Sequence, residues 1–284
     1  MSSKPNALNY LNLVAYIVNV AVTYGLGLLG LFGASTNGEL SEKYQTLVTP
    51  VGWAFAIWSI IFISQLIFVI VQFLSAFRSS PLVQDGVKWY YIGVCLAQAA
   101  WTLTFSFEFI VGSAVAMLTI LAFLVTTVVS QYKAVESVSQ RDFWLLKFPF
   151  SIHCGWIVAA SFVNINVVLV YYELESSIQL FAAIASLVGV LAAAVVALKV
   201  PKTPEYVIPL VLVWATAGIA VELGNPKELI ENTFEENTIT AVQYGAAFTS
   251  AAVGIFVVLA GIQDIRARRS RGTGTQEEGE YLRA

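Results

Sequence analysis

The stretch FWLLKFPFSIHCGWIVAASFVNINVVLVYY, residues 143–172, is long and apolar enough to cross a bilayer as a single helix. It nevertheless contains a proline, the only histidine of the chain, a tryptophan and two asparagines. At about 100° per residue, an arc of about 60° collects five of its side chains on one stripe: Pro149, His153, Trp156, Ala160 and Asn164. An unpaired imidazole or amide is costly in hydrocarbon, so we expect this stripe to face other helices or a cavity and not lipid.

The composition of the chain is strongly apolar. Hydrophobic residues make up 58% of the 284 residues and charged residues only 12%, and the mean hydropathy is +0.76. These values exceed those of a soluble domain and predict an all-α integral membrane protein with several spans. Cys95 and Cys154 both lie in apolar runs, so we interpret them as small apolar side chains. The N-terminus shows no cleavage signature, and the first apolar run is expected to be retained.

Apolar runs of roughly 20 residues predict about eight transmembrane helices, at 9–33, 51–77, 89–107, 110–131, 143–172, 179–198, 206–222 and 239–263. The distribution of Lys and Arg supports this number, because these residues collect at the N-terminus, in every second loop and in the C-terminal tail. The opposite side has only Lys43 and Lys227. We therefore predict that both termini lie on the cytoplasmic side, or its equivalent in an organelle.

Two features are expected on the side opposite the termini. The segment GNPKELIENTFEENT, residues 224–238, has the composition of a short interfacial helix that begins after Asn225-Pro226. Glu108 and Glu222 end two of the predicted spans on this side. We interpret them as carboxylates that reach water, with the guarding of a vestibule as the alternative.

Three segments resemble the translocator protein family, whose members are also called tryptophan-rich sensory proteins and have five transmembrane helices around a pocket. TPVGWAFAIWSIIF at 49–62 is similar to the family's second helix, and QAAWTLTFSF at 98–107 is similar to its third. The W-x3-A-x3-N spacing that ends at Asn164 is similar to its fifth helix. Trp53 and Trp58 are five residues apart where the family pattern has six, which rotates one ring by about 100° relative to the other.

The resemblance covers about residues 1–172, and the whole chain is most similar to longer, eight-helix relatives of the family. It implies three parts: a five-helix translocator-protein-like bundle at 1–172, three additional transmembrane helices at 173–263, and a flexible charged tail at 264–284. It also implies a pocket for a flat apolar ligand such as a porphyrin, a sterol or a carotenoid, and no other cofactor is expected. The candidate ligand-binding residues are Trp53, Phe55, Trp58, Trp101, His153, Trp156 and Asn164.

Physical chemistry allows the same pocket, because each indole ring offers a broad apolar face and one N–H group. Ordinary helix packing is the alternative for these rings. His153 has three possible roles: a hydrogen bond between helices, which we favour, a polar contact to a ligand, or metal ligation. Gln65, Gln72 and Gln98 are interpreted as polar contacts between helices.

Several functions are disfavoured by the sequence. The last span lacks the lysine that a retinal protein needs, and the spans lack the mid-membrane Asp, Glu or Arg typical of ion pumps and coupled transporters. The sequence also has no Gly-rich phosphate loop and no nucleophile elbow. We therefore expect neither enzymatic activity nor a nucleic-acid partner.

We predict a multi-pass membrane protein whose first five helices bind or sense a hydrophobic small molecule. One alternative is a transporter of such lipophilic molecules. A second is a structural subunit of a larger membrane complex, in which the last three spans form a protein interface. Membrane lipids are the expected surroundings, and the sequence leaves open a homo-oligomer or a larger complex.

Overall fold

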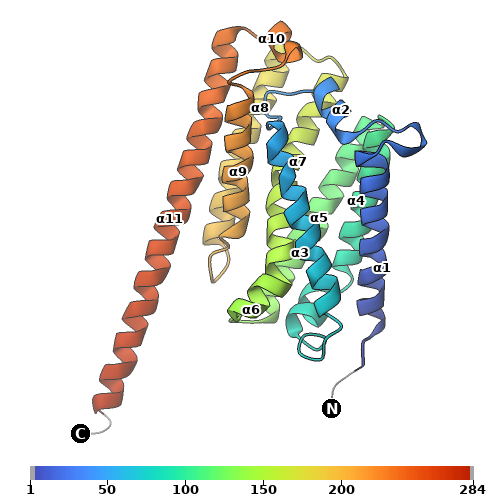
Figure 1. Cartoon of the computed structure of the whole chain (residues 1–284). Helices are drawn as coiled ribbons and strands as arrows, with labels where there is room; N and C mark the ends of the chain where they lie inside the picture. The colour runs from blue at the N-terminus through green and yellow to red at the C-terminus, as the bar shows by residue number, and fades with distance from the viewer. Residues whose placement is uncertain (1–3, 282–284) are drawn as a thin grey trace.

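The computed structural model describes residues 4–281, with side chains for residues 4–267, and this part of the chain is helical without any strand (Figure 1). Its α-helices are α1 Ala7–Val22, α2 Asn37–Lys43, α3 Ile57–Val71, α4 Tyr90–Ser106, α5 Ile110–Ala134, α6 Gln140–Asp142, α7 Phe148–Tyr171, α8 Ser176–Lys199, α9 Val207–Glu222, α10 Glu228–Thr233 and α11 Glu236–Tyr281. Short π-helical or 3-10 segments adjoin them: η1 Thr23–Leu28, η2 Leu31–Gly33, η3 Gly52–Ala56, η4 Leu82–Val87 and η5 Phe143–Lys147.

Each of the eight predicted spans contains one long helix. Within the described residues, six helical segments are long and apolar enough to cross a membrane, and they contain α1, α3, α5, α7, α8 and the first part of α11, to Ala267. The remaining two helices are shorter, since α4 has 17 residues and α9 has 16. At 1.5 Å per residue, about 20 residues are needed for a hydrocarbon core of about 30 Å. The structure therefore confirms a multi-helix membrane protein, with α4 and α9 as the short members of the bundle.

The long helices run side by side, and their connections lie at two ends of the bundle (Figure 1). The start of α1 and the far end of α11 lie at the same end, which we call the termini end. The short helices α2 and α10 lie at the opposite end, which we call the loop end. The predicted short helix after Asn225-Pro226 is confirmed as α10, and its place at the membrane interface stays a prediction. The backbone of the predicted tail continues α11 as far as Tyr281. Side chains after Ala267 lie outside the described residues, so the flexibility of the tail stays a prediction.

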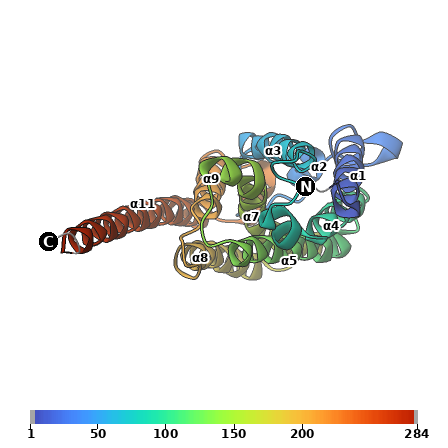
Figure 2. The same cartoon turned by 90° about the horizontal axis from the view of Figure 1, so that it is seen from below.

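Helix α7 is at the centre of this arrangement (Figure 2). On one side it packs against α3 and α5, and α4 and α1 follow beyond them. On the other side it packs against α8 and α9, which α11 covers from outside. His153, Trp156 and Asn164 are 0%, 2% and 7% exposed. This confirms the expectation that the polar stripe of residues 143–172 does not face lipid.

The start of α7 explains how a proline fits into a span. The chain enters through the π-helical segment η5 and becomes α-helical at Phe148, which places Pro149 in the first turn. A proline is tolerated there because its missing N–H has no partner within the first turn of a helix. The proline therefore marks the beginning of α7 and does not interrupt it.

Buried polar contacts close the termini end of the bundle. Glu205, in the loop between α8 and α9, is 2% exposed. Its carboxylate accepts hydrogen bonds from Tyr132 Oη at 2.7 Å, from Ser151 Oγ at 3.2 Å and from the backbone N–H of Val207 at 2.9 Å. These contacts join the later helices to α5 and α7.

A cavity lined by aromatic rings

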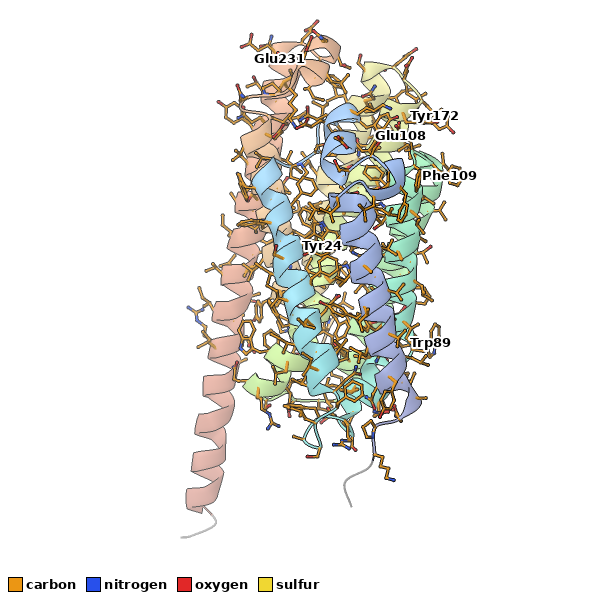
Figure 3. The ribbon with its side chains drawn as sticks, turned by 45° about the vertical axis from the view of Figure 1, so that its right-hand side comes forward. Tyr24, Trp89, Glu108, Phe109, Tyr172 and Glu231 are labelled. Carbon is orange, nitrogen blue, oxygen red and sulfur yellow. The ribbon has the colours of Figure 1, made fainter. Side chains whose placement is uncertain are left out.

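A cavity of about 520 Å³ lies among six of the long helices, α3, α4, α5, α7, α8 and α9, and the segment η1, and it reaches the loop end. Its volume is in the usual range for small-molecule sites, about 300–1,000 Å³. Tyr24 of η1 forms part of the wall between α1 and α3 (Figure 3). The lining residues nearest the loop end come from α2, and among them Gly38 and Glu42 are exposed to solvent. The cavity therefore combines an apolar interior with a polar rim.

Aromatic rings from η3, α3 and α7 meet edge to face in the cavity wall. The ring centroids of Phe55 and Trp156 are 5.5 Å apart at 82°, and those of Trp58 and Trp156 are 6.3 Å apart at 81°. Trp58 also stacks on Phe62, with centroids 5.6 Å apart. Edge-to-face contacts hold aromatic rings at defined angles. This part of the wall is therefore a rigid apolar surface.

A second part of the wall comes from α4 and is oriented by α7. Trp101 Nε1 donates a hydrogen bond to Asn164 Oδ1 at 3.0 Å, and Trp101 stacks on Phe105 with centroids 5.2 Å apart. Asn164 Nδ2 donates to the carbonyl oxygen of Ala160 at 3.2 Å, one turn earlier in α7. The side chain of Asn164 is thus fixed by its own helix, and it fixes the indole of Trp101.

Five of the seven sequence-predicted site residues line the cavity, namely Phe55, Trp58, Trp101, Trp156 and Asn164. Trp53 does not line it. Its ring is 44% exposed and packs edge-on against Trp214, with centroids 4.6 Å apart. The five-residue separation from Trp58 passes through the tight 3-10 segment η3, so the two rings point in different directions.

His153 also lies outside the cavity lining. Its Nδ1 is 2.8 Å from Nε2 of Gln65 on α3. Its ring contacts the ring of Trp58 edge to face, with centroids 5.6 Å apart at 68°. An amide Nε2 can only donate, so in this contact Nδ1 accepts. The favoured interpretation of His153, a hydrogen bond between helices, is confirmed. The histidine therefore packs against a ring of the cavity wall, that of Trp58, without lining the cavity itself.

The later helices also contribute to the cavity, which corrects the expectation that the first five helices form the pocket alone. Ser186, Leu187 and Val190 of α8 line it, together with Ala215, Thr216 and Ile219 of α9. The sequence pattern could not show this, because a resemblance confined to residues 1–172 carries no information on how α8 and α9 pack. The cavity therefore lies between the two parts that the sequence suggested.

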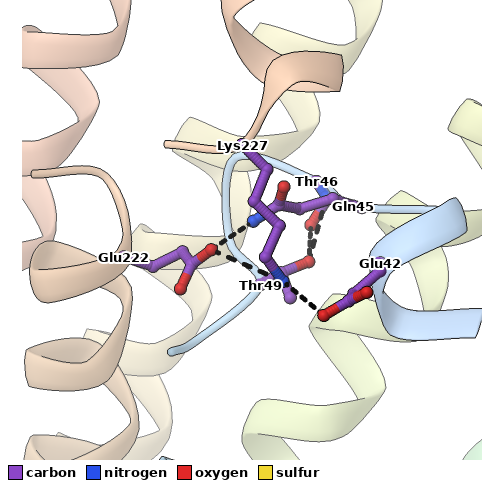
Figure 4. A network of polar contacts seen from close by, with 6 residues as sticks. All are labelled: Glu42, Gln45, Thr46, Thr49, Glu222 and Lys227. Carbon is purple, nitrogen blue, oxygen red and sulfur yellow. Dashed lines mark hydrogen bonds and ion pairs between the residues drawn. The ribbon is translucent and has the colours of Figure 1, made fainter. Parts of the chain in front are cut away.

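At the rim, polar contacts connect the segment 42–49 with Glu222 and Lys227, which lie at the end of α9 and just before α10 (Figure 4). Gln45 Nε2 donates to Glu222 Oε1 at 2.5 Å, and the hydroxyl oxygens of Thr46 and Thr49 are 3.0 Å apart. Lys227 Nζ lies 3.4 Å from Glu42 Oε1 and 3.9 Å from Glu222 Oε1. Glu222 is only 8% exposed, so it is a buried partner in this network and not a free carboxylate in water.

Helix α1 has a buried polar face that we did not predict from the sequence. Asn9, Asn12 and Asn19 are each at most 1% exposed, and Asn9 and Asn12 donate through Nδ2 to Gln72 Oε1 at 3.3 and 3.2 Å. Their signal is visible in hindsight, because positions 9, 12, 16, 19 and 23 follow the three- and four-residue spacing of one helix face. Glu205 had no such signal, because a loop glutamate gives no indication of its burial.

The comparisons with known proteins agree with this architecture. A family model described as TSPO-like protein matches residues 9–259. The match begins in the first turn of α1 and ends about halfway along α11, so it includes at least part of each of the eight long helices. No match was found among curated proteins or among solved structures.

Proposed function

Because the chain belongs to the TSPO-like protein family, we propose that it binds a hydrophobic small molecule in the cavity between α3, α4, α7, α8 and α9. The observation that carries this proposal is the aromatic wall around about 520 Å³ of space, in which a hydrogen bond from Trp101 to Asn164 holds one ring in place. An apolar, flat ligand such as a porphyrin, a sterol or a carotenoid fits these surfaces, because the aromatic faces offer broad apolar contact. The buried Nε1 of Trp156 has no partner among the described residues, so it can donate a hydrogen bond to a polar group of the ligand.

The proposed role is binding or sensing, without catalysis. In the membrane we propose that the termini end faces the cytoplasm or the equivalent compartment, because Lys and Arg collect there. The rim of the cavity then faces the opposite compartment. A hydrophobic ligand is expected to reach the cavity from that side or from the lipid, since the exposed Tyr24 and Leu28 belong to its wall.

The first experiment tests for a bound molecule. The protein is purified gently from its native membrane, its absorption spectrum is recorded, and the solvent extract is analysed by mass spectrometry. A Soret or carotenoid band, or a sterol, at near-stoichiometric yield is the expected result. The yield is then compared between two variants that each introduce a phenylalanine, Ala160→Phe inside the cavity and Ile63→Phe on the outer face of α3, where Ile63 is 59% exposed.

The bound molecule is expected to be lost from Ala160→Phe and kept by Ile63→Phe. If both folded variants retained the same molecule at the same yield, the ligand would not occupy this cavity. A thermal unfolding curve for each variant identifies a loss of binding that is due to misfolding.

Transport of the same class of molecule is a second candidate function, and one observation favours it. The lining residues of the cavity reach the loop end, while the termini end is held together by the buried contacts of Glu205. Such one-sided access is typical of one state of a transporter. Flux of a lipophilic fluorescent molecule across proteoliposomes, above the rate for empty vesicles and abolished by Ala160→Phe, would support transport, whereas saturable binding without flux would reject it.

A further inference from the structure

The charge at the rim restricts what the polar end of a ligand can be. Among the described residues that line the cavity, only Glu42 and Lys227 are charged. The ammonium group of Lys227 already lies 3.4 Å from a carboxylate oxygen of Glu42 and 3.9 Å from one of Glu222 (Figure 4). One cation is therefore shared by two carboxylates, and the rim has no spare positive charge for an anionic ligand.

The surroundings of the rim supply no free positive charge either. Lys43, the other lysine in the described part of the loop end, forms an ion pair with Glu108. Hydrogen bonds from Lys43 and then Tyr44 lower the pKa of Glu108, so this carboxylate is ionised at neutral pH. Glu231 on α10 adds a further exposed negative charge (Figure 3). A negative field around a cavity mouth disfavours the approach of anions.

The hydrogen-bonding groups at the rim point to the same conclusion. Asn37, in the first turn of α2, lines the cavity, and its buried Oδ1 has no hydrogen-bond partner. A carbonyl oxygen can only accept a hydrogen bond, and the carboxylate oxygens of Glu42 are acceptors as well. A ligand head that donates a hydrogen bond satisfies these acceptors, whereas a carboxylate at the rim adds another acceptor and an unpaired charge. An alcohol can also accept a hydrogen bond from Nε1 of Trp156, the buried donor in the lining that has no partner among the described residues.

From these three observations we propose that the cavity takes a lipophilic molecule whose polar end is an uncharged hydrogen-bond donor, in the simplest case an alcohol, and that it discriminates against the same body ending in a carboxylate. This inference rests on the proposed binding function and narrows its ligand class. Hydroxylated sterols and carotenoids meet the requirement. A tetrapyrrole with free propionate groups does not meet it unless those groups remain in water outside the rim.

Three probes with one apolar body separate charge from hydrogen bonding: retinol, retinyl methyl ether and ionised retinoic acid. Their dissociation constants are measured at pH 8 by quenching of tryptophan fluorescence, with the full chain in nanodiscs of uncharged phosphatidylcholine and with empty nanodiscs as the partition control. We expect retinol to bind at least about 10-fold more tightly than retinoate, with the ether between them; a 10-fold ratio corresponds to about 1.4 kcal/mol.

Two variants that each remove one negative charge from the loop end locate the effect. Glu42→Gln relieves Lys227 of one carboxylate, so retinoate affinity is expected to rise about 3-fold or more and the gap to retinol to narrow. Glu231→Gln is the matched control, because Glu231 is exposed and does not line the cavity. It is expected to change the retinol-to-retinoate ratio by clearly less than Glu42→Gln does, because Glu231 adds to the field around the rim but does not compete for Lys227.

The outcomes distinguish this inference from the proposed function. Retinoate binding as tightly as retinol, with both blocked by Ala160→Phe, would overturn the inference and leave the cavity as a ligand site. A normal ratio that Glu42→Gln and Glu231→Gln alter equally would overturn the assignment to the rim. If none of the probes bound saturably above the empty nanodiscs, and no molecule co-purified, the proposed function itself would be rejected.

Discussion

The hydrogen bond between Trp101 and Asn164 allows a quantitative test of the cavity wall. Trp101 is 7% exposed, and its N–H donates to Asn164 over 3.0 Å. Asn164→Ala leaves this N–H without an acceptor, and an unpaired buried donor generally costs about 1–3 kcal/mol. Hydrogen bonds between helices in a membrane average about 0.6 kcal/mol and reach about 1.7 kcal/mol. The two ranges overlap at about 1–1.7 kcal/mol, which is the expected loss in the free energy of unfolding.

A double-mutant cycle isolates this contact from the loss of apolar area. Trp101→Phe removes the donor, so the double variant Trp101→Phe/Asn164→Ala should lose about 1 kcal/mol less than the sum of the single variants. Unfolding is measured in mixed micelles with increasing SDS. Asn166→Ala is the matched control, because Asn166 donates to Ser186 Oγ at 2.9 Å and has no contact with Trp101. A coupling below about 0.3 kcal/mol for Asn164, or an equal coupling for Asn166, would refute the proposed role of this hydrogen bond.

Three further predictions test other parts of the structure. Glu205→Ala removes a buried carboxylate that accepts three hydrogen bonds, and it is expected to lower the free energy of unfolding by about 3 kcal/mol. Glu136→Ala, at an exposed position, should change the free energy of unfolding by less than about 0.5 kcal/mol in the same SDS titration. Hydrogen bonds from Lys43 and Tyr44 lower the pKa of Glu108, so the contribution of this carboxylate to stability is complete above the usual carboxyl pKa and is lost as the pH falls through the lowered pKa. Glu108→Gln should therefore be less stable than the parent protein at pH 7 and equally stable at pH 2. An equal loss of stability at both pH values would contradict the ion pair. A Cβ at Gly27 would lie 2.8 Å from the side-chain nitrogen of Asn37, while the nearest atom to one at Gly25 is 3.6 Å away. Gly27→Ala should therefore melt at a lower temperature than Gly25→Ala, by the equivalent of about 1 kcal/mol at most, and equal melting points would show that the Asn37 side chain moves aside without cost.

The sequence was sufficient for the features that depend on local composition and period. Long apolar runs predicted the helices, because a backbone in hydrocarbon must satisfy its own hydrogen bonds within a helix. The charge asymmetry predicted two termini at one end, and the structure places the start of α1 and the far end of α11 there. The period of α7 placed Trp156 and Asn164 on one face, and both residues line the cavity.

Only the tertiary structure decided which faces meet. Trp53 and Trp58 have the same side chain and lie only five residues apart, yet Trp58 lines the cavity and Trp53 packs against Trp214 outside it. The contributions of α8 and α9 and the burial of Glu205 were equally invisible in the sequence, because they depend on contacts between residues far apart in the chain. A helical period fixes directions within one helix, but the rotation of each helix against its neighbours is set by the packing of all of them. The aromatic composition of the site is therefore a property of the sequence, while its enclosure, its rim and its charge are properties of the fold.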